Sequence, residues 1–200
     1  MYNYHMVKNT IIKYPNGKKG SYEKPKNSQS GRGMELEKEI GLTNAYYLDE
    51  DRAIIYKKPT PVTIVKVDYP RRSAAKITEA YFKVPSTTDY NGIYRGKYID
   101  FEAKECASNT SFPLSSIHEH QVSHLKRVVS HGAIAFAIIR FTTLSITYYV
   151  EAKKLVSYIE TTSKRSIPLS WFQENAYEIP YNYLKPVDYL NIVDQLYFEE

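Results

Sequence analysis

The run AIAFAIIRF, at residues 133–141, is apolar at every position except Arg140. A strand that is apolar on both faces has to be covered on both sides, because either face would otherwise meet water. The next segment, LSITYYVEA, also has the composition of a strand. The two segments predict an α/β fold in which helices pack on a mixed central β-sheet.

Helical segments are predicted on both sides of this run. In GRGMELEKEIGLTNAYYL, the side chains of Leu36, Ile40 and Tyr47 share one face. The segment SSIHEHQVSHLKRVVSHG has an S-x-x-E capping box at Ser116 and Glu119 and a terminal glycine. Shorter helices are predicted in AKKLVSYIE and DYLNIVDQLYF.

Residues 62–83 predict a β-hairpin, with VTIVKVDY and KITEAYFK as its strands and PRRS as its turn. Charged and apolar residues interleave in both strands, so neither has a clean apolar face to bury. We therefore expect the hairpin to project from the domain, with Arg71 and Arg72 near its tip. A helix over residues 73–83 is the competing interpretation.

The charge is concentrated in the first part of the chain. Residues 1–83 carry 16 basic and 9 acidic side chains, whereas residues 84–200 carry 11 and 13. Residues 1–32 are rich in Lys, Gly, Asn and Ser and predict a basic, disordered arm, followed by a single domain over residues 33–200. A basic half indicates a polyanionic partner, most often nucleic acid.

No targeting or membrane segment is expected. No apolar run approaches the ~20 residues of a membrane span, and the first 20 residues lack the apolar block of a signal peptide. Cys106 is the one cysteine, so no intrachain disulfide can form. A cytoplasmic protein without membrane attachment is expected.

The stretch TTDYNGIYRGKYIDFEAKE, at residues 87–105, predicts a second hairpin. With Arg95 and Gly96 at the centre of the turn, Asp89 faces Glu102. Residues directly opposed in an antiparallel pair project from the same face. That face then also carries Thr87, Asp100 and Lys104, whereas Ile99, Phe101 and Ala103 point toward a core.

The register has one alternative. Asn91-Gly92 has the better composition for a type I′ turn, and a turn there would set Asp89 against Tyr94. The Arg95-Gly96 turn is favoured because it leaves two longer strands.

Opposed carboxylates need a compensating charge, since like charges across a ladder destabilise a sheet. A divalent cation would supply it, and hard oxygen ligands suit Mg²⁺ or Mn²⁺. Lys104 would lie beside the metal, placed to orient a water or to stabilise a charged phosphorus centre.

Asp89, followed after twelve residues by Glu102-x-Lys104, resembles the D…(D/E)-x-K pattern of restriction-endonuclease-like nucleases. Over residues 31–200 the chain further resembles the RecU family of Holliday junction resolvases. The matching segments are GRGMELE, KKPTPVTIVKVDYPRRSAA, EAYFK, TTDYNGIYRGKYIDFEAKE, TSFPL, HEHQ and DQLYF. The resemblance implies a restriction-endonuclease-like mixed sheet flanked by helices, with the 62–83 hairpin as a stalk that enters the junction centre.

The resemblance also implies the roles of particular residues. The metal, Mg²⁺ with Mn²⁺ as a substitute, would be held by Thr87, Asp89, Glu102 and Gln121. Asp89, Glu102 and Lys104 would be catalytic, with Lys104 stabilising the transition state. Glu37 is a further metal-associated candidate, although a solvated helix charge is favoured, and Asp100 is ranked as a neighbour of the metal site.

DNA-contacting candidates lie mostly on the hairpin. Arg71, Arg72 and Lys76 are expected to contact phosphates, and Phe82 is the first candidate for stacking on unpaired bases. Tyr81, Tyr90 and Tyr94 are further stacking candidates.

The implied activity is symmetric hydrolysis of four-way DNA junctions by a homodimer, in recombination and DNA repair at the nucleoid. Water would attack phosphorus in line with the leaving 3′ oxygen and give a 5′ phosphate. A recombinase or branch-migration protein is a further expected partner. The alternatives are a nuclease of the same fold that cuts ordinary duplex, and a non-catalytic protein that binds DNA or regulates a recombinase.

Overall fold

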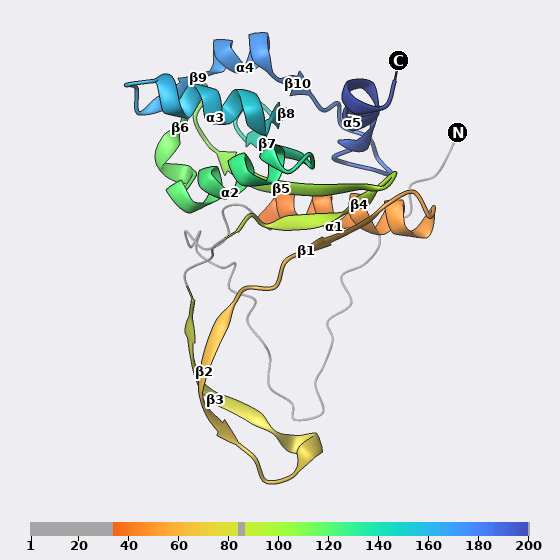
Figure 1. Cartoon of the computed structure of the whole chain (residues 1–200), viewed down its shortest axis with the longest axis vertical. Coiled ribbons are helices and arrows are strands. Elements are labelled where there is room, and N and C mark those ends of the chain that lie inside the picture. The colour runs from red at the N-terminus through yellow and green to blue at the C-terminus, as the bar shows by residue number, and fades with distance from the viewer. Residues whose placement is uncertain (1–33, 84–86, 200) are drawn as a thin grey trace, which may run out of the picture. The chain divides into compact units, whose positions relative to one another are not determined.

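A computed structural model describes residues 34–83 and 87–199 (Figure 1). The predicted arm, residues 1–32, lies outside this part of the chain. The described elements are α1 (Met34–Asp49), β1 (Ile54–Lys57), β2 (Val62–Asp68), η2 (Arg72–Ala74), β3 (Lys76–Phe82), β4 (Tyr90–Tyr94), β5 (Lys97–Cys106), β6 (Ser111–Pro113), η3 (Leu114–Ser116), α2 (Glu119–Ser130), β7 (Ile134–Phe141), β8 (Ile146–Glu151), α3 (Ala152–Thr161), β9 (Ser166–Pro168), α4 (Leu169–Asn175), β10 (Tyr177–Glu178) and α5 (Leu190–Tyr197).

The central sheet is mixed. Its strand order is β1-β4-β5-β7-β8-β10, with β5 and β7 parallel and the other neighbours antiparallel. Residues 134–141 of the apolar run form β7, in the middle of the sheet, and are buried at every position except Arg140, which is half-buried. The predicted fold class, a mixed sheet flanked by helices with a separate hairpin, is confirmed.

Helices cover both faces of this sheet, and alternate residues of β7 reach the two cores. On one face, Phe136 and Ile138 pack with residues of α1 and α5. On the other, Ala135, Ala137 and Ile139 pack in clusters that include residues of α2, α3 and α4. The face that α1 and α5 cover also takes Ile99, Phe101 and Ala103, as the alternation predicted.

The hairpin at 62–83 is formed by β2 and β3, which pair only with each other among the described strands (Figure 1). Every residue of both strands is exposed. The competing helix over 73–83 is wrong, because residues 76–82 pair as a strand. The turn contains a short 3₁₀ segment, η2.

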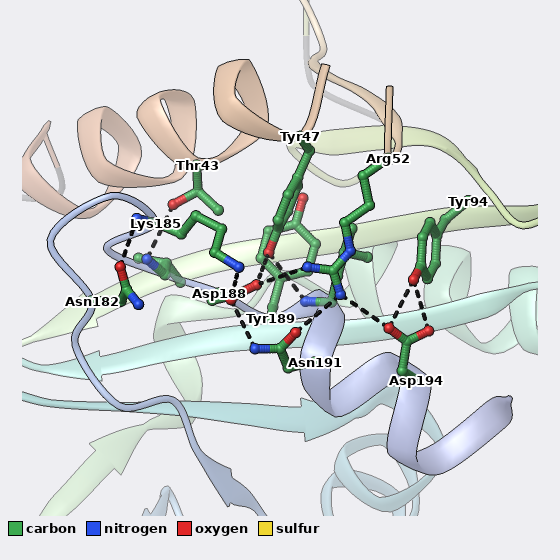
Figure 2. Close-up of polar contacts among 12 residues, drawn as sticks. Thr43, Tyr47, Arg52, Tyr94, Asn182, Lys185, Asp188, Tyr189, Asn191 and Asp194 are labelled. Carbon is green, nitrogen blue, oxygen red and sulfur yellow. Dashed lines mark hydrogen bonds and ion pairs between the residues drawn. The ribbon is translucent and has the colours of Figure 1, made fainter. Parts of the chain in front are cut away.

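Helix α5 is anchored by a polar network that faces α1 and β4 (Figure 2). The hydroxyl of Tyr47 donates to Asp188 at 2.6 Å, and Lys185 forms an ion pair with the same carboxylate at 2.5 Å. Arg52 reaches Asp194 at 3.0 Å. The C-terminal segment is thereby held beside the first helix.

The start of the central helix differs from the prediction. Ser116 lies in η3, and α2 begins at Glu119 with His118 as its N-cap. The capping interaction is made by Gln121, whose side-chain oxygen accepts from the backbone N–H of His118 at 2.9 Å. The Ser116–Glu119 box is therefore wrong, because the 3₁₀ turn at 114–116 delays the helix.

None of the helices described is both long enough and apolar enough to span a bilayer.

Candidate metal and nuclease site

The site begins at the turn between β4 and β5. Arg95 and Gly96 both have positive φ, +48° and +75°, as the primed turns of tight hairpins require. The ladder runs from Tyr94 opposite Lys97 to Tyr90 opposite Phe101. The predicted register is confirmed over this range, and the next positions in order are residues 89 and 102.

The alternative turn at Asn91-Gly92 is wrong. Gly92 lies inside β4, between Ile55 of β1 and Ile99 of β5. A Cβ atom on Gly92 would lie 2.1 Å from the carbonyl oxygen of Ile54. The glycine is therefore needed for the close approach of β1, not for a turn.

The catalytic candidates meet at the end of this hairpin. Lys104 forms an ion pair with Oε1 of Glu102, and its Nζ lies 3.9 Å from a carboxylate oxygen of Asp89. Gln121 of α2 donates from Nε2 to the same Glu102 oxygen at 2.7 Å. Four of the five predicted metal and catalytic residues are thus brought together by the residue before β4, by β5 and by α2.

Glu102 is the most constrained member of the group. Its side chain is fully buried, and its second oxygen, Oε2, has no hydrogen-bond partner in the described part of the chain. Burial, and after it the neighbouring Asp89, raise the pKa of its carboxyl to about 8 against the lowering effect of Lys104. A buried, unpaired carboxylate oxygen is costly unless a cation or donor satisfies it.

A divalent cation fits this donor set. Two carboxylates, Asp89 and Glu102, are adjacent, and one buried oxygen is free to bind. No three His, Cys, Asp or Glu side chains are placed to hold a metal within residues 34–83 and 87–199. The remaining ligands would then be neutral groups, water or phosphate, which is the usual arrangement around Mg²⁺ in phosphate chemistry.

Gln121 lies at the site in a specific orientation. Its Oε1 accepts from the backbone of His118, so the group that faces Glu102 is the amide NH₂. In this arrangement Gln121 fixes the Glu102 carboxylate, and direct ligation through Oε1 would require the amide to turn. The predicted ligand is therefore in place, with its oxygen already used.

Thr87 is half-buried, and its hydroxyl lies 3.5 Å from the carbonyl oxygen of Thr88. Asp89, Glu102, Lys104 and Gln121 are thus linked by ion pairs and a hydrogen bond, whereas Thr87 makes no hydrogen bond to Asp89, Glu102 or Gln121 among the described residues.

A pocket of about 330 Å³ opens beside the cluster and includes Glu37, Asp89 and Lys104 in its lining. Glu37 also pairs with Lys57 at 2.5 Å. Burial raises the pKa of the nearby Tyr90 phenol, and the charges of Glu37, Asp89 and Glu102 raise it further. Glu37 therefore faces the site, although its ion pair is made with Lys57.

The DNA-contacting candidates have mixed outcomes. Arg71 and Lys76 are exposed at the hairpin turn and the start of β3, and Phe82 is 81% exposed at the opposite end of β3, near the hairpin root. The side chain of Arg72 is outside the described structure. Tyr90 and Tyr94 are buried in the core, so the expectation that they stack on bases is wrong, whereas Tyr81 is exposed.

Sequence reasoning missed the surroundings of Asp100. Its side chain is fully buried and is met by Lys58, Thr88, Tyr98 and His124. The available signals were the i, i+4 spacing of His120 and His124 and the face that Asp100 shares with Glu102. Neither identifies Lys58 or Thr88.

The chain is similar to known proteins over most of its length. Residues 31–195 match the sequence model of the RecU family, described as recombination protein U. Holliday junction resolvase RecU of Geobacillus kaustophilus is 48% identical over 196 residues, which cover 94% of this chain and 98% of the relative. The Oceanobacillus iheyensis protein of the same description is 55% identical over 172 residues, or 84% and 88% of the two chains. A solved structure, the Holliday junction resolvase Hjc of Archaeoglobus fulgidus, covers 74% of this chain and 96% of its own at 14% identity, with a TM-score of 0.44. The family match spans all the residues of the candidate site.

Proposed function

The chain belongs to the RecU family, and on this premise we propose that it is an endonuclease that resolves four-way DNA junctions with Mg²⁺. The relatives are described as Holliday junction resolvases. The products would be symmetric nicks with 5′ phosphates, made during recombination and DNA repair in the cytoplasm.

One observation supports this function above the others. Asp89, Glu102 and Lys104 converge at the end of the β4-β5 hairpin, and Glu102 keeps one buried oxygen without a partner. A protein that only bound DNA would have no use for a buried carboxylate that keeps one oxygen without a partner and lies next to another carboxylate. The cluster therefore favours catalysis over binding alone.

The roles of the residues follow from their positions. A bound divalent cation would neutralise charge on the scissile phosphate and activate a water. Asp89 and Glu102 would hold it, and Gln121 keeps the Glu102 carboxylate oriented by donating from its amide Nε2 to Oε1 of Glu102. Lys104 is 22% exposed, so its ammonium can reach the pocket and stabilise the negative charge that develops on phosphorus.

The exposed hairpin supports a branched substrate. Strands β2 and β3 expose the apolar side chains of Val62, Ile64, Val67 and Phe82 as well as cationic ones. Such a surface can stack on bases and contact phosphates at a junction centre, where a continuous duplex offers no opening. Two copies of the chain would cut the two equivalent strands, so we infer a homodimer. A recombinase or branch-migration protein could then be engaged at the same junctions.

The test is cleavage of a labelled four-way junction against linear duplex of the same sequence, with Mg²⁺ and with EDTA. The Asp89→Asn variant is run in parallel and checked for junction binding. Symmetric nicks that disappear with EDTA and in the variant, while binding persists, are expected. Equal cutting of the duplex would favour a general nuclease of the same fold, and tight binding without metal-dependent cutting would leave a DNA-binding protein.

A further inference from the structure

A second buried carboxylate, Asp100, lies two residues before Glu102 on the same strand. Its side chain is fully buried and has four partners. Lys58 pairs with it at 2.9 Å, the Tyr98 hydroxyl donates at 2.8 Å, Nε2 of His124 lies 3.2 Å away, and the Thr88 hydroxyl donates to the other oxygen. Asp100 is therefore fully committed to protein contacts, unlike Glu102.

Two of these partners are the residues at the ends of the β2-β3 hairpin segment. Lys58 follows β1 directly and leads into the hairpin, and Thr88 lies on the return path, one residue before Asp89. Lys58 Nζ also donates to the Thr88 hydroxyl at 2.9 Å. The two ends are thus bound to one carboxylate and to each other.

A backbone hydrogen bond joins the same two ends of the hairpin segment. The N–H of Lys58 donates to the carbonyl oxygen of Asp89 at 2.8 Å. Asp89 itself stands just outside the β4-β5 ladder, which ends at Tyr90. The position of Asp89 relative to Glu102 therefore depends on contacts made through Lys58 and Thr88.

We propose that Asp100 is a positioning residue that clamps the root of the hairpin and thereby holds Asp89 opposite Glu102. The clamp consists of Asp100, Lys58 and Thr88. It would make the metal site sensitive to how the hairpin is seated, because both depend on the same buried carboxylate. Where the readout is cleavage, this inference rests on the proposed junction-resolving activity.

The test compares Thr88→Val, which removes the hydroxyl, with Thr88→Ser, which keeps it. Loss of the hydroxyl leaves the buried Asp100 and Lys58 short of a partner and frees the segment before Asp89. Thr88→Val is expected to lower the single-turnover cleavage rate on saturating junction on the order of 10- to 100-fold, with junction affinity nearly unchanged. Thr88→Ser is expected to recover most of the rate.

A matched control is available in the α5 network of Figure 2. Asp188 is also a buried aspartate that pairs with a lysine and accepts from a tyrosine hydroxyl, but it lies in the network of α1 and α5. Asp188→Asn is expected to lower the free energy of unfolding without lowering the cleavage rate. A parallel loss of rate and stability in Asp188→Asn and Thr88→Val would reduce the clamp to ordinary structural support and overturn the proposal.

A second readout needs neither DNA nor metal. Hydrogen exchange of the Lys58 amide, measured by NMR in EDTA, reports whether its bond to Asp89 opens. Faster exchange in Thr88→Val and Asp100→Asn, but not in Asp188→Asn, is expected. Unchanged exchange in these variants, or faster exchange with a full cleavage rate, overturns the clamp. If the variants show the expected exchange but the wild-type protein cuts no junction, only the proposed function is overturned.

Discussion

Glu102 combines burial with a free oxygen, and this combination makes the site dependent on a cation. Its side chain is fully buried, while Asp89 and Lys104 are partly exposed. The arrangement would therefore place one proposed metal ligand inside the protein and leave the other two charges accessible to a phosphate. Stability and catalysis make opposite demands on this carboxylate.

We expect the metal-free protein to lose stability as the pH rises. The pKa of Glu102 is about 8 in the folded state against an ordinary value of 4.5, so the folded state retains a proton that the unfolded chain has lost between these values. The stabilisation is complete below about pH 4.5 and is lost as the pH rises toward 8. Urea unfolding in EDTA at pH 5.5 and 8.5 should show that the free energy of unfolding falls by about 3 kcal/mol less in Glu102→Gln than in the wild type. Equal falls in both proteins would contradict the shifted pKa.

Lys104 is expected to act in the reaction and not in folding. Lys104→Met should lower the cleavage rate on the order of 100-fold or more, because a charge aimed at the transition state is lost. The matched control is Lys126→Met, since Lys126 also forms an ion pair, with Glu160 at 2.6 Å, but on an exposed surface. Single-turnover cleavage at saturating Mg²⁺ checks the difference, and equal rates for the two variants would remove Lys104 from the mechanism.

At the scale of elements, the β2-β3 hairpin is separable from the core. All its strand residues are exposed, and the N–H of Lys83 donates to the carbonyl oxygen of Pro61 at 3.0 Å at its base. A short Gly-Ser linker can therefore replace residues 62–82.

We expect this shortened protein to keep the unfolding temperature within a few degrees, since no buried apolar contact is removed. Junction cleavage should fall strongly, while Mn²⁺ binding by the metal site persists. Thermal unfolding, Mn²⁺ titration and junction cleavage are the measurements. A shortened protein that still cuts junctions in preference to duplex would show that the hairpin has no part in recognition.

The two glycines of the β4-β5 hairpin are expected to respond differently to alanine. Gly92→Ala forces a Cβ against the backbone of β1, and Gly96→Ala meets open space but keeps a φ of +75°. The first should cost about 2–3 kcal/mol of unfolding free energy, and the second about 1 kcal/mol. Urea unfolding of both variants tests the order, and a larger loss at Gly96 would contradict the packing of β1 on β4.

The sequence predicted the long elements because their periodicity extends over many residues. The buried run of β7, the helical face of Leu36, Ile40 and Tyr47, and the hairpin register each depend on a repeated local pattern. The strands β6, β9 and β10 were missed because two or three residues form no pattern, and their pairing partners are distant in sequence. Helix α4, with seven residues, was missed for the same reason.

At the scale of the whole molecule, the site could be predicted only in part. Asp89, Glu102 and Lys104 followed from the register of one hairpin, which is local information. The Asp100 cluster draws its partners from the residue after β1, the return of the hairpin, β5 and α2, and no spacing in the sequence brings them together. Gln121 followed from family resemblance alone, and its role in capping α2 needed the structure.

A homodimer makes a specific prediction about mixed subunits. A heterodimer of wild-type and Asp89→Asn chains has one working site, so it should nick one strand of a junction and leave the other intact. Differently tagged chains allow the mixed species to be purified, and denaturing gels separate single from paired cuts. Paired cuts by the mixed dimer, or full activity of a monomer, would contradict two sites acting together.

The backbone hydrogen bond between Lys58 and Asp89 has a consequence for how the protein can change during evolution. The chain leaves the sheet at Lys58 and returns beside it at Asp89. The residues between them are therefore an insertion whose two ends are adjacent. An insert of this kind can lengthen, shorten or be exchanged between relatives as long as Lys58 and Thr88 keep their bonds to Asp100, because these two residues at its ends hold the reaction centre. Substrate choice and phosphodiester hydrolysis can then diverge at independent rates within one gene.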